Sequence, residues 1–193
     1  MKGGFIMKIK ITFLILVLMM ALITGCGKKE GTTKNESGNT NTTVTPEAVS
    51  SASIVNTEEG FLNAISAKGT WIIAITKDLT INKDLLLEGE FKNGKKDDKG
   101  NDILQRKIAL YAQDENRNIT ARYTLTAPKL TVTSPMASIQ HGTFKGDLYV
   151  SVENFQLVDA TVDGNVYFTT DKAKSTFIMD KTSKITGKQE IKK

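Results

Sequence analysis

Apolar and polar residues divide the chain into three stretches. An unbroken apolar run from Phe13 to Ile23 follows a short segment that carries three lysines and no acidic residue. Residues 27–53 are rich in Thr, Ser, Asn and Gly, and their only bulky apolar residues are two valines. From residue 54 onward apolar residues return in a regular pattern. The pattern therefore predicts a folded region over residues 54–193, preceded by a tether that cannot bury enough surface to fold.

The first element predicted in the folded region is a short amphipathic helix. Phe61, Leu62 and Ile65 fall on one face of it, and Asn56 and Glu59 have the spacing of an N-cap residue and its capping-box partner. No later stretch has the periodicity of a helix. The rest is a series of short β-type runs, in the first of which we expect Trp71 to be a core residue. These runs are 71–75, 79–81, 85–87, 108–111, 123–125 and 130–132.

The last third of the chain repeats itself with an offset of 18 residues. Small or apolar residues recur at six matched positions. The pairs are Ile139 with Leu157, Gly142 with Ala160, Phe144 with Val162, Gly146 with Gly164, Leu148 with Val166, and Val150 with Phe168. Leu130 and Val132 continue the pattern one step back, and residues 177–179 and 185–187 continue it one step forward after a short insertion.

A short repeat of V-x-V runs without helices is typical of a β-solenoid, in which each coil buries its inward face only by stacking on its neighbours. Strands of successive coils would lie about 4.8 Å apart, and a glycine at each corner permits a turn that a Cβ would obstruct. We therefore predict an all-β fold, a single-stranded parallel β-helix of about six or seven coils. The helix near residue 61 would cap its first coil.

Three resemblances support this prediction. Residues 69–73 and 78–81, together with the preceding helix, resemble the opening of right-handed parallel β-helix proteins of the pectate-lyase type. The repeat at residues 160–166 is similar to that of bactofilins, which are polymer-forming β-helix proteins. The whole of residues 54–193 resembles small β-helix lipoproteins of Gram-positive bacteria that carry no established activity. The resemblance to pectate-lyase-type proteins implies a right-handed coil. The repeat length does not decide the hand, because left-handed solenoids also use 18 residues per coil.

The N-terminal stretch predicts the location of the protein. The apolar run has eleven residues, whereas a membrane-spanning helix needs about 20, so the run is typical of a secretory signal. Leu22-Ile23-Thr24-Gly25-Cys26 resembles a bacterial lipobox, and Cys26 is the chain's only cysteine. We expect residues 1–25 to be a signal peptide, acylated Cys26 to anchor the chain in the lipid bilayer, and residues 26–53 to tether the domain on the extracytoplasmic face.

Removal of this signal changes the charge of the protein. The whole chain has a net charge of +5, but the signal holds three of its 26 basic residues and none of its 21 acidic ones. The mature chain therefore carries +2. This balance gives no reason to expect a nucleic-acid partner, because such proteins concentrate positive charge on one face.

Two groups of side chains in the folded region are candidates for a metal site and a catalytic pair. Asp97, Asp98 and Asp102 lie in a long insertion over residues 92–107 and could offer oxygen ligands to calcium, but four neighbouring lysines oppose a divalent cation. His141 and Asp159 occupy the same position in successive repeats, so stacking would pair them. A surface salt link explains that pair better than a catalytic dyad does. We expect neither a metal nor another cofactor.

Tyr149 and Tyr167 each lie between two inward residues, so alternation directs both outward, one coil apart. Such a pair could bind a sugar ring or a partner protein, or it could pack only against itself. The sequence favours a non-enzymatic module of the cell envelope that is structural or binds a wall glycan or a protein. The alternatives are a small lyase-like polysaccharide enzyme and a self-assembling, bactofilin-like scaffold, which a capping helix would oppose.

Overall fold

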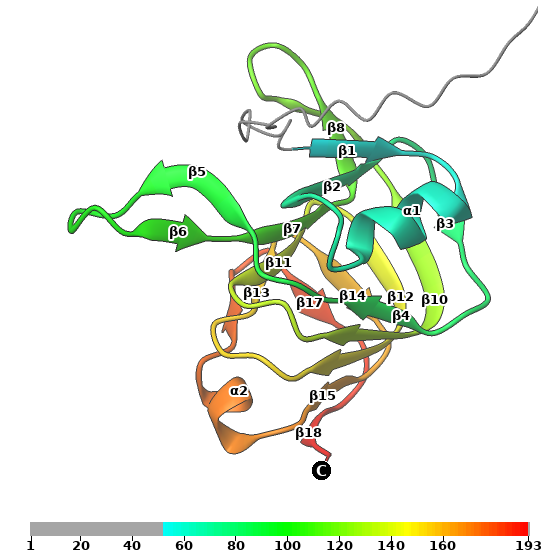
Figure 1. Ribbon diagram of the computed structural model, residues 1–193. Helices are drawn as coiled ribbons and strands as arrows, with labels where there is room; N and C mark the ends of the chain where they lie inside the picture. Colours follow the sequence, from blue (N-terminus) through cyan, green and yellow to red (C-terminus); the bar gives the residue numbers. More distant parts are fainter. Residues whose placement is uncertain (1–51, 193) are drawn as a thin grey trace, which may run out of the picture. The chain divides into compact units, whose positions relative to one another are not determined.

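Parallel strands are the main elements of residues 52–192, the part of the chain that the computed structural model describes (Figure 1). The predicted all-β class is confirmed. The expected signal peptide, Cys26 and nearly all of the expected tether lie outside the described residues. No helix within residues 52–192 is long and apolar enough to cross a membrane.

The first sheet, called sheet A here, has six strands, and every pair of neighbours is parallel. Its order is β1 (Ala52–Val55), β2 (Ile72–Ile75), β7 (Arg106–Ala109), β11 (Ala137–Gln140), β13 (Gln156–Val158) and β16 (Ile178–Met179). The order follows the sequence, so β1 and β16 are its two edges.

The second sheet, sheet B, is built around two long parallel strands, β10 (Thr124–Val132) and β12 (Thr143–Val150). The runs predicted at 123–125 and 130–132 belong to one strand, β10, except that Tyr123 precedes it. β3 (Leu79–Thr80) and β4 (Leu85–Leu87) pair with one side of β10. On the far side of β12 follow β14 (Thr161–Asp163) and β15 (Val166–Phe168), and then β17 (Lys184–Ile185) and β18 (Gln189–Ile191).

The 18-residue offset of the sequence is the strand register of β11 with β13 and of β12 with β14 and β15. Ile139 pairs with Leu157 in sheet A, and Phe144 pairs with Val162 in sheet B. In the last step the pairs lie 22 or 23 residues apart, as for Leu157 with Met179. The extra residues form the short helix α2 (Asp171–Ser175), so the prediction of no later helix is wrong. Five residues are too few to show helical periodicity in a sequence.

Inward residues of both sheets form one continuous core, in which like positions of successive strands stack. At one corner of the stack the backbones approach so closely that only glycine fits. A Cβ on Gly146 would lie 1.9 Å from the carbonyl oxygen of Ala127, and one on Gly164 would lie 2.1 Å from that of Gly146. The glycines of the repeat therefore serve close approach, as expected.

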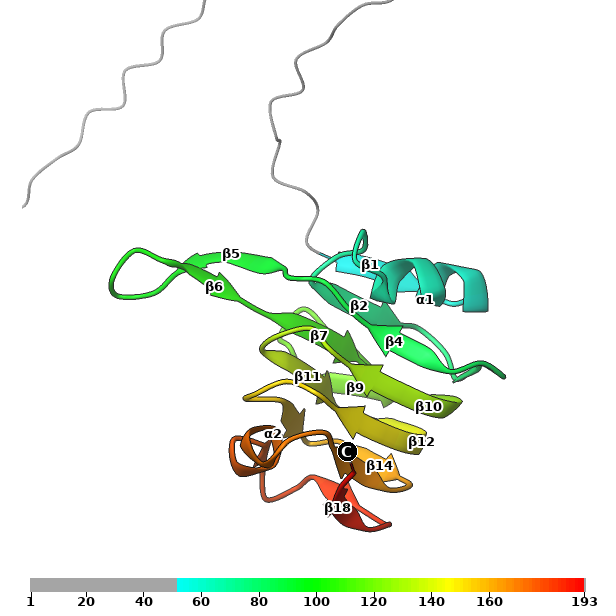
Figure 2. The ribbon, with the colours of Figure 1, turned by 60° about the horizontal axis from the view of Figure 1, so that its bottom comes forward.

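Helix α1 (Glu58–Ile65) lies at the β1 end of this core, where it buries Phe61, Ala64 and Ile65 (Figure 2). Its N-cap is Thr57, whose hydroxyl accepts a hydrogen bond from the Gly60 N–H. The predicted capping box of Asn56 and Glu59 is therefore wrong by one residue. The folded region also begins two residues earlier than predicted, because β1 starts at Ala52.

Two antiparallel hairpins flank β7. The insertion forms the hairpin of β5 (Lys92–Lys96) and β6 (Asp102–Leu104), which projects away from the sheets in Figure 1. The second hairpin joins β8 (Tyr111–Gln113) to β9 (Ile119–Arg122). Tyr111, expected at the end of a core strand, instead begins this hairpin.

Candidate functional site

Tyr149 and Tyr167 lie side by side on the outer face of sheet B, as predicted. Their ring centroids are 4.8 Å apart, which is about the spacing of neighbouring strands, so each ring covers part of the other's face. The Lys192 ammonium lies 4.5 Å from the Tyr167 centroid and donates a hydrogen bond to the Tyr149 hydroxyl at 3.0 Å. This bond raises the pKa of Lys192. The ladder is confirmed as packing, and its binding role stays a prediction.

The predicted pair of His141 and Asp159 is present. His141 Nδ1 lies 3.0 Å from Asp159 Oδ2, and both residues have left-handed backbones at successive turns of the stack. Arg122 donates to the same carboxylate oxygen and to the Asp159 carbonyl. The hydrogen bonds from His141 and then Arg122 lower the pKa of Asp159. A carboxylate held charged in this way is a poor proton acceptor.

Two residues of this corner were missed by the sequence reasoning, because the β8–β9 hairpin supplies both. Arg122 ends β9, and the ring of Tyr111 packs edge-on against the His141 ring at a centroid distance of 4.6 Å. The cluster thus joins the hairpin to two successive turns. Its geometry fits a structural salt link, as expected from the sequence.

The acidic insertion uses its carboxylates to build its own hairpin. Asp97 accepts hydrogen bonds from the Lys99 and Asn101 backbones. Asp102 forms ion pairs with Lys92 and Lys96, and the hydrogen bonds that it accepts from these two lysines lower its pKa to about 2. No group of three metal-ligating side chains occurs among residues 52–192.

The outer face of sheet A carries an arrangement that the sequence reasoning did not find. The Lys107 ammonium lies 5.9 Å from the centroid of Trp71 and 6.0 Å from that of Tyr111. All three side chains are half-buried, so the prediction of Trp71 as a core residue is wrong. Trp71 precedes the first residue of β2, and the alternation of that strand therefore does not reach it.

Lys107 has both apolar and polar neighbours on the same face. Its strand neighbours are Ile72 and Ser138, and the Gln140 amide donates to the Ser138 hydroxyl at 3.1 Å. Gln156 follows Ser138 in the same column. Within the described residues Lys107 makes no ion pair. We call Trp71, Lys107 and Tyr111 the aromatic–lysine site. The outward direction of Lys107 could have been predicted from its two buried neighbours in β7. The position of Tyr111 beside it could not, because that position depends on the geometry of the β8–β9 hairpin.

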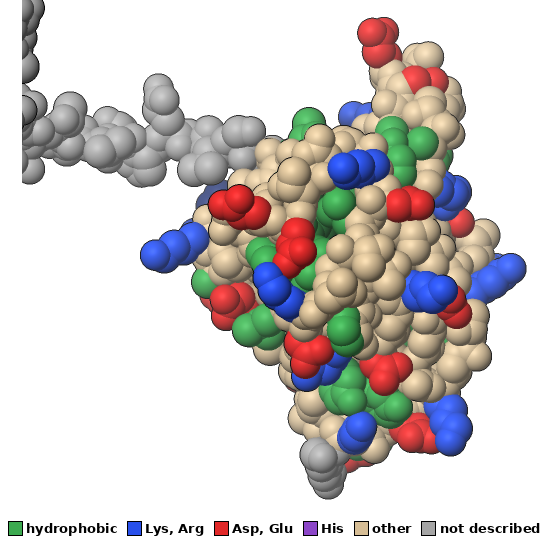
Figure 3. Space-filling model, turned by 90° about the vertical axis from the view of Figure 1, so that its right-hand side faces the viewer, with side chains coloured by type: hydrophobic (Ala, Val, Ile, Leu, Met, Phe, Trp, Pro, Cys, Tyr) green, Lys and Arg blue, Asp and Glu red, His purple; other side chains and the backbone are tan. Residues whose placement is uncertain are grey.

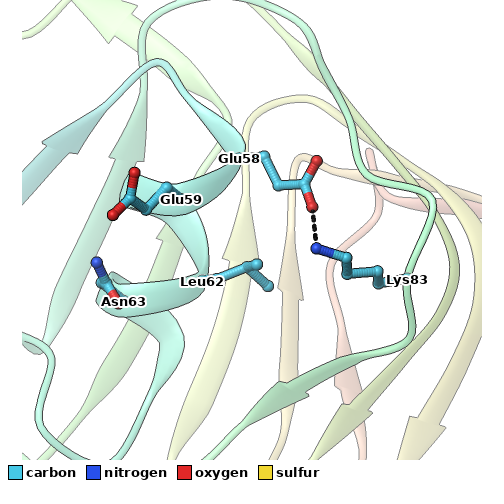
Figure 4. Close-up of a pocket in the computed structure, with 5 residues that line it drawn as sticks. All are labelled: Glu58, Glu59, Leu62, Asn63 and Lys83. Carbon is cyan, nitrogen blue, oxygen red and sulfur yellow. Dashed lines mark ion pairs between the residues drawn. The ribbon is translucent and has the colours of Figure 1, made fainter.

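A pocket of about 360 Å³ lies beside α1 (Figure 4). The Glu58 carboxylate in it is paired with Lys83 at 2.7 Å, and Figure 4 shows Glu59 and Asn63 on the other side of the helix from that pair. Figure 3 views the side of the molecule on which α1 lies, and hydrophobic side chains there form separate patches among charged ones. The polar groups of this pocket do not converge on one point.

Arg106 is fully buried, with a relative exposure of 0 %, and it forms no ion pair within residues 52–192. Its guanidinium donates to the carbonyls of Ala64 at 2.7 Å, Ser66 at 3.0 Å and Glu88 at 3.2 Å, and it lies 3.7 Å from the Phe91 ring centroid. Burial lowers its pKa to about 10. Because the first two carbonyls lie at the C-terminal end of α1, Arg106 fastens the helix to the stack.

Comparison with known proteins finds no matching family model, no similar curated protein and no similar solved structure.

Proposed function

We propose that this chain is a membrane-anchored extracytoplasmic lipoprotein whose all-β part is a parallel β-helix that binds a cell-wall glycan. The lipobox-like sequence at Cys26 supports the anchor. The parallel pairing of successive strands in two sheets supports a solenoid of about six coils, capped at its first coil by α1, and the resemblance to pectate-lyase-type proteins implies that it is right-handed.

The aromatic–lysine site is the observation that carries the glycan proposal. Rings of Trp71 and Tyr111 offer apolar surface to the C–H face of a sugar, and both also carry a polar group. The Lys107 ammonium lies near both rings and forms no ion pair within residues 52–192, so it could pair with a carboxylate or phosphate on the glycan. The amides of Gln140 and Gln156 on the same face supply hydrogen bonds for sugar hydroxyls.

A lyase-like enzyme is the second candidate, and Lys107 also favours it. The amine of Lys107 on the outer face of the sheet could act as the general base that a polysaccharide lyase needs. A binding protein and a lyase differ in what happens to the glycan, so one incubation separates them. Unsaturated products or new reducing ends after this incubation would show cleavage of the glycan and would favour the enzyme over the binding protein.

Co-sedimentation of residues 27–193 with insoluble wall glycan tests the proposal. Trp71→Ala combined with Tyr111→Ala should weaken binding at least about 10-fold, and Lys107→Met should do the same while keeping the aliphatic stem. Thermal unfolding followed by circular dichroism shows whether these variants remain folded, since Tyr111 also packs on His141.

Tyr149→Ala combined with Tyr167→Ala is the matched control, because it removes two outward aromatic rings from the other sheet. If the glycan binds through the aromatic–lysine site, this variant should bind as the wild type does. Loss of binding in the control alone would assign the glycan to the tyrosine ladder instead. Full binding by all three variants would refute both assignments.

A further inference from the structure

The stack ends differently at its two edges. At the β1 end, α1 covers the core and buries Phe61. At the β16 end, Met179 and Ile191 occupy inward columns, yet they are 42 % and 37 % exposed, because no strand among the described residues follows them. Ile178 beside them is 50 % exposed. We call residues 177–192, which include β16, β17 and β18, the open end (Figure 2).

Charge is distributed unevenly between these ends. Residues 177–192 contain four lysines and two acidic residues, whereas residues 52–91 contain six acidic residues and three lysines. Lys181 and Lys184 are exposed and form no ion pair within the described residues, and the Lys188 ammonium pairs only with Glu190, at 3.7 Å. The open end therefore combines exposed apolar side chains with a rim of lysines.

We propose that the open end docks on a bilayer that contains anionic phospholipid. Apolar side chains that enter the headgroup region, surrounded by lysines that attract anionic lipids, are the features of interfacial membrane binding. A tail-to-tail contact with a second copy would bring the two lysine rims together, so charge disfavours it. An acidic protein that paired a strand with the open sheet edge would leave the exposed Ile178, Met179 and Ile191 without a specific role.

The length of chain that precedes the described residues permits this contact. The two edges of sheet A are separated by five strand spacings, or about 24 Å. The 25 residues between Cys26 and Ala52 can span at most about 80 Å when extended. An anchor at Cys26 therefore allows the open end to reach the same bilayer at high effective concentration. This step rests on the proposed function, whereas binding by the open end itself does not.

The test uses residues 27–193, which lack the anchor, and vesicles of phosphatidylcholine with or without about 30 % phosphatidylglycerol. The chain should sediment with anionic vesicles at low salt, and added salt should release it. Changing Lys181, Lys184 and Lys188 to Glu should weaken partitioning about 100-fold or more. Changing Lys77, Lys95 and Lys99 to Glu alters the net charge equally but should have a much smaller effect.

Three results would overturn the proposal. They are no preference for anionic vesicles, equal loss in the two triple variants, or a concentration-dependent rise in the mass of the protein that explains sedimentation by self-association. Because no glycan and no lipidated cysteine take part, these results are independent of those for the aromatic–lysine site and Cys26.

Discussion

Arg106 offers the sharpest test of how the stack is closed. Its guanidinium donates three hydrogen bonds to main-chain carbonyls, at 2.7, 3.0 and 3.2 Å, from a fully buried position. Each hydrogen bond from a charged group contributes about 1.5–3 kcal/mol, but burying the cation has a desolvation cost that opposes them. Arg106→Ala removes both the hydrogen bonds and the desolvation cost, and it leaves the carbonyls at the end of α1 without partners. We expect a net loss of about 3 kcal/mol in the free energy of unfolding.

Urea unfolding of residues 27–193, followed by circular dichroism, measures this loss. Arg117→Ala is the matched control, because Arg117 is exposed on the β8–β9 turn, and its removal should change stability by less than about 0.5 kcal/mol. Amide hydrogen exchange should also speed up in α1 of the Arg106 variant before it does so in β10 or β12. A destabilisation below about 1 kcal/mol, with unchanged exchange in α1, would refute the view that Arg106 fastens the helix.

Three further predictions follow from the geometry of the stack. Gly164→Ala should cost about 2–3 kcal/mol, because its Cβ would meet the Gly146 carbonyl at 2.1 Å, whereas Gly94→Ala, with open space around it, should cost only about 1 kcal/mol for its φ of 78°. Equal costs in urea unfolding would contradict the close approach. Thr57→Ala should lose about 1 kcal/mol by the same assay, as expected for an N-cap; no change would mean that the cap is elsewhere. Hydrogen bonds, of which the one with the Ser183 side chain has the largest effect, lower the pKa of Asp180 to about 2. The charged Asp180 carboxylate therefore stabilises the fold above about pH 4, and this contribution is lost as the pH falls towards 2. Asp180→Asn should therefore be less stable than the wild type at pH 7 and equally stable near pH 2, and a pH-independent difference would exclude this role.

The sequence predicted the stacked strands well, because inward residues recur with the same offset that sets the register. Phe144 with Val162 and Leu148 with Val166 are direct strand neighbours, and the corner glycines lie where the backbones touch. The pairing of His141 with Asp159 followed from the same offset. Contacts between equivalent positions of a repeat are thus readable from one sequence.

Contacts that depend on the insertions were not readable in this way. Tyr111 reaches both His141 and Lys107 because β8 turns away from the direction of β7, and the sequence alone does not fix that turn. Arg106 follows the inward alternation of β7, but the sequence does not explain why an arginine lies in the core. The explanation is that the carbonyl groups at the C-terminal end of α1 lie beside it and accept its hydrogen bonds. The aromatic–lysine site escaped prediction for this physical reason.

Fluorescence of Trp71 tests the central claim most directly, because it is the chain's only tryptophan and lies in the proposed glycan site. Titration of residues 27–193 with soluble fragments of wall glycan should shift or quench its emission in a saturable way, and Lys107→Met should weaken the apparent affinity. If the glycan binds in sedimentation while the emission of Trp71 stays constant throughout the titration, the glycan does not bind at the aromatic–lysine site.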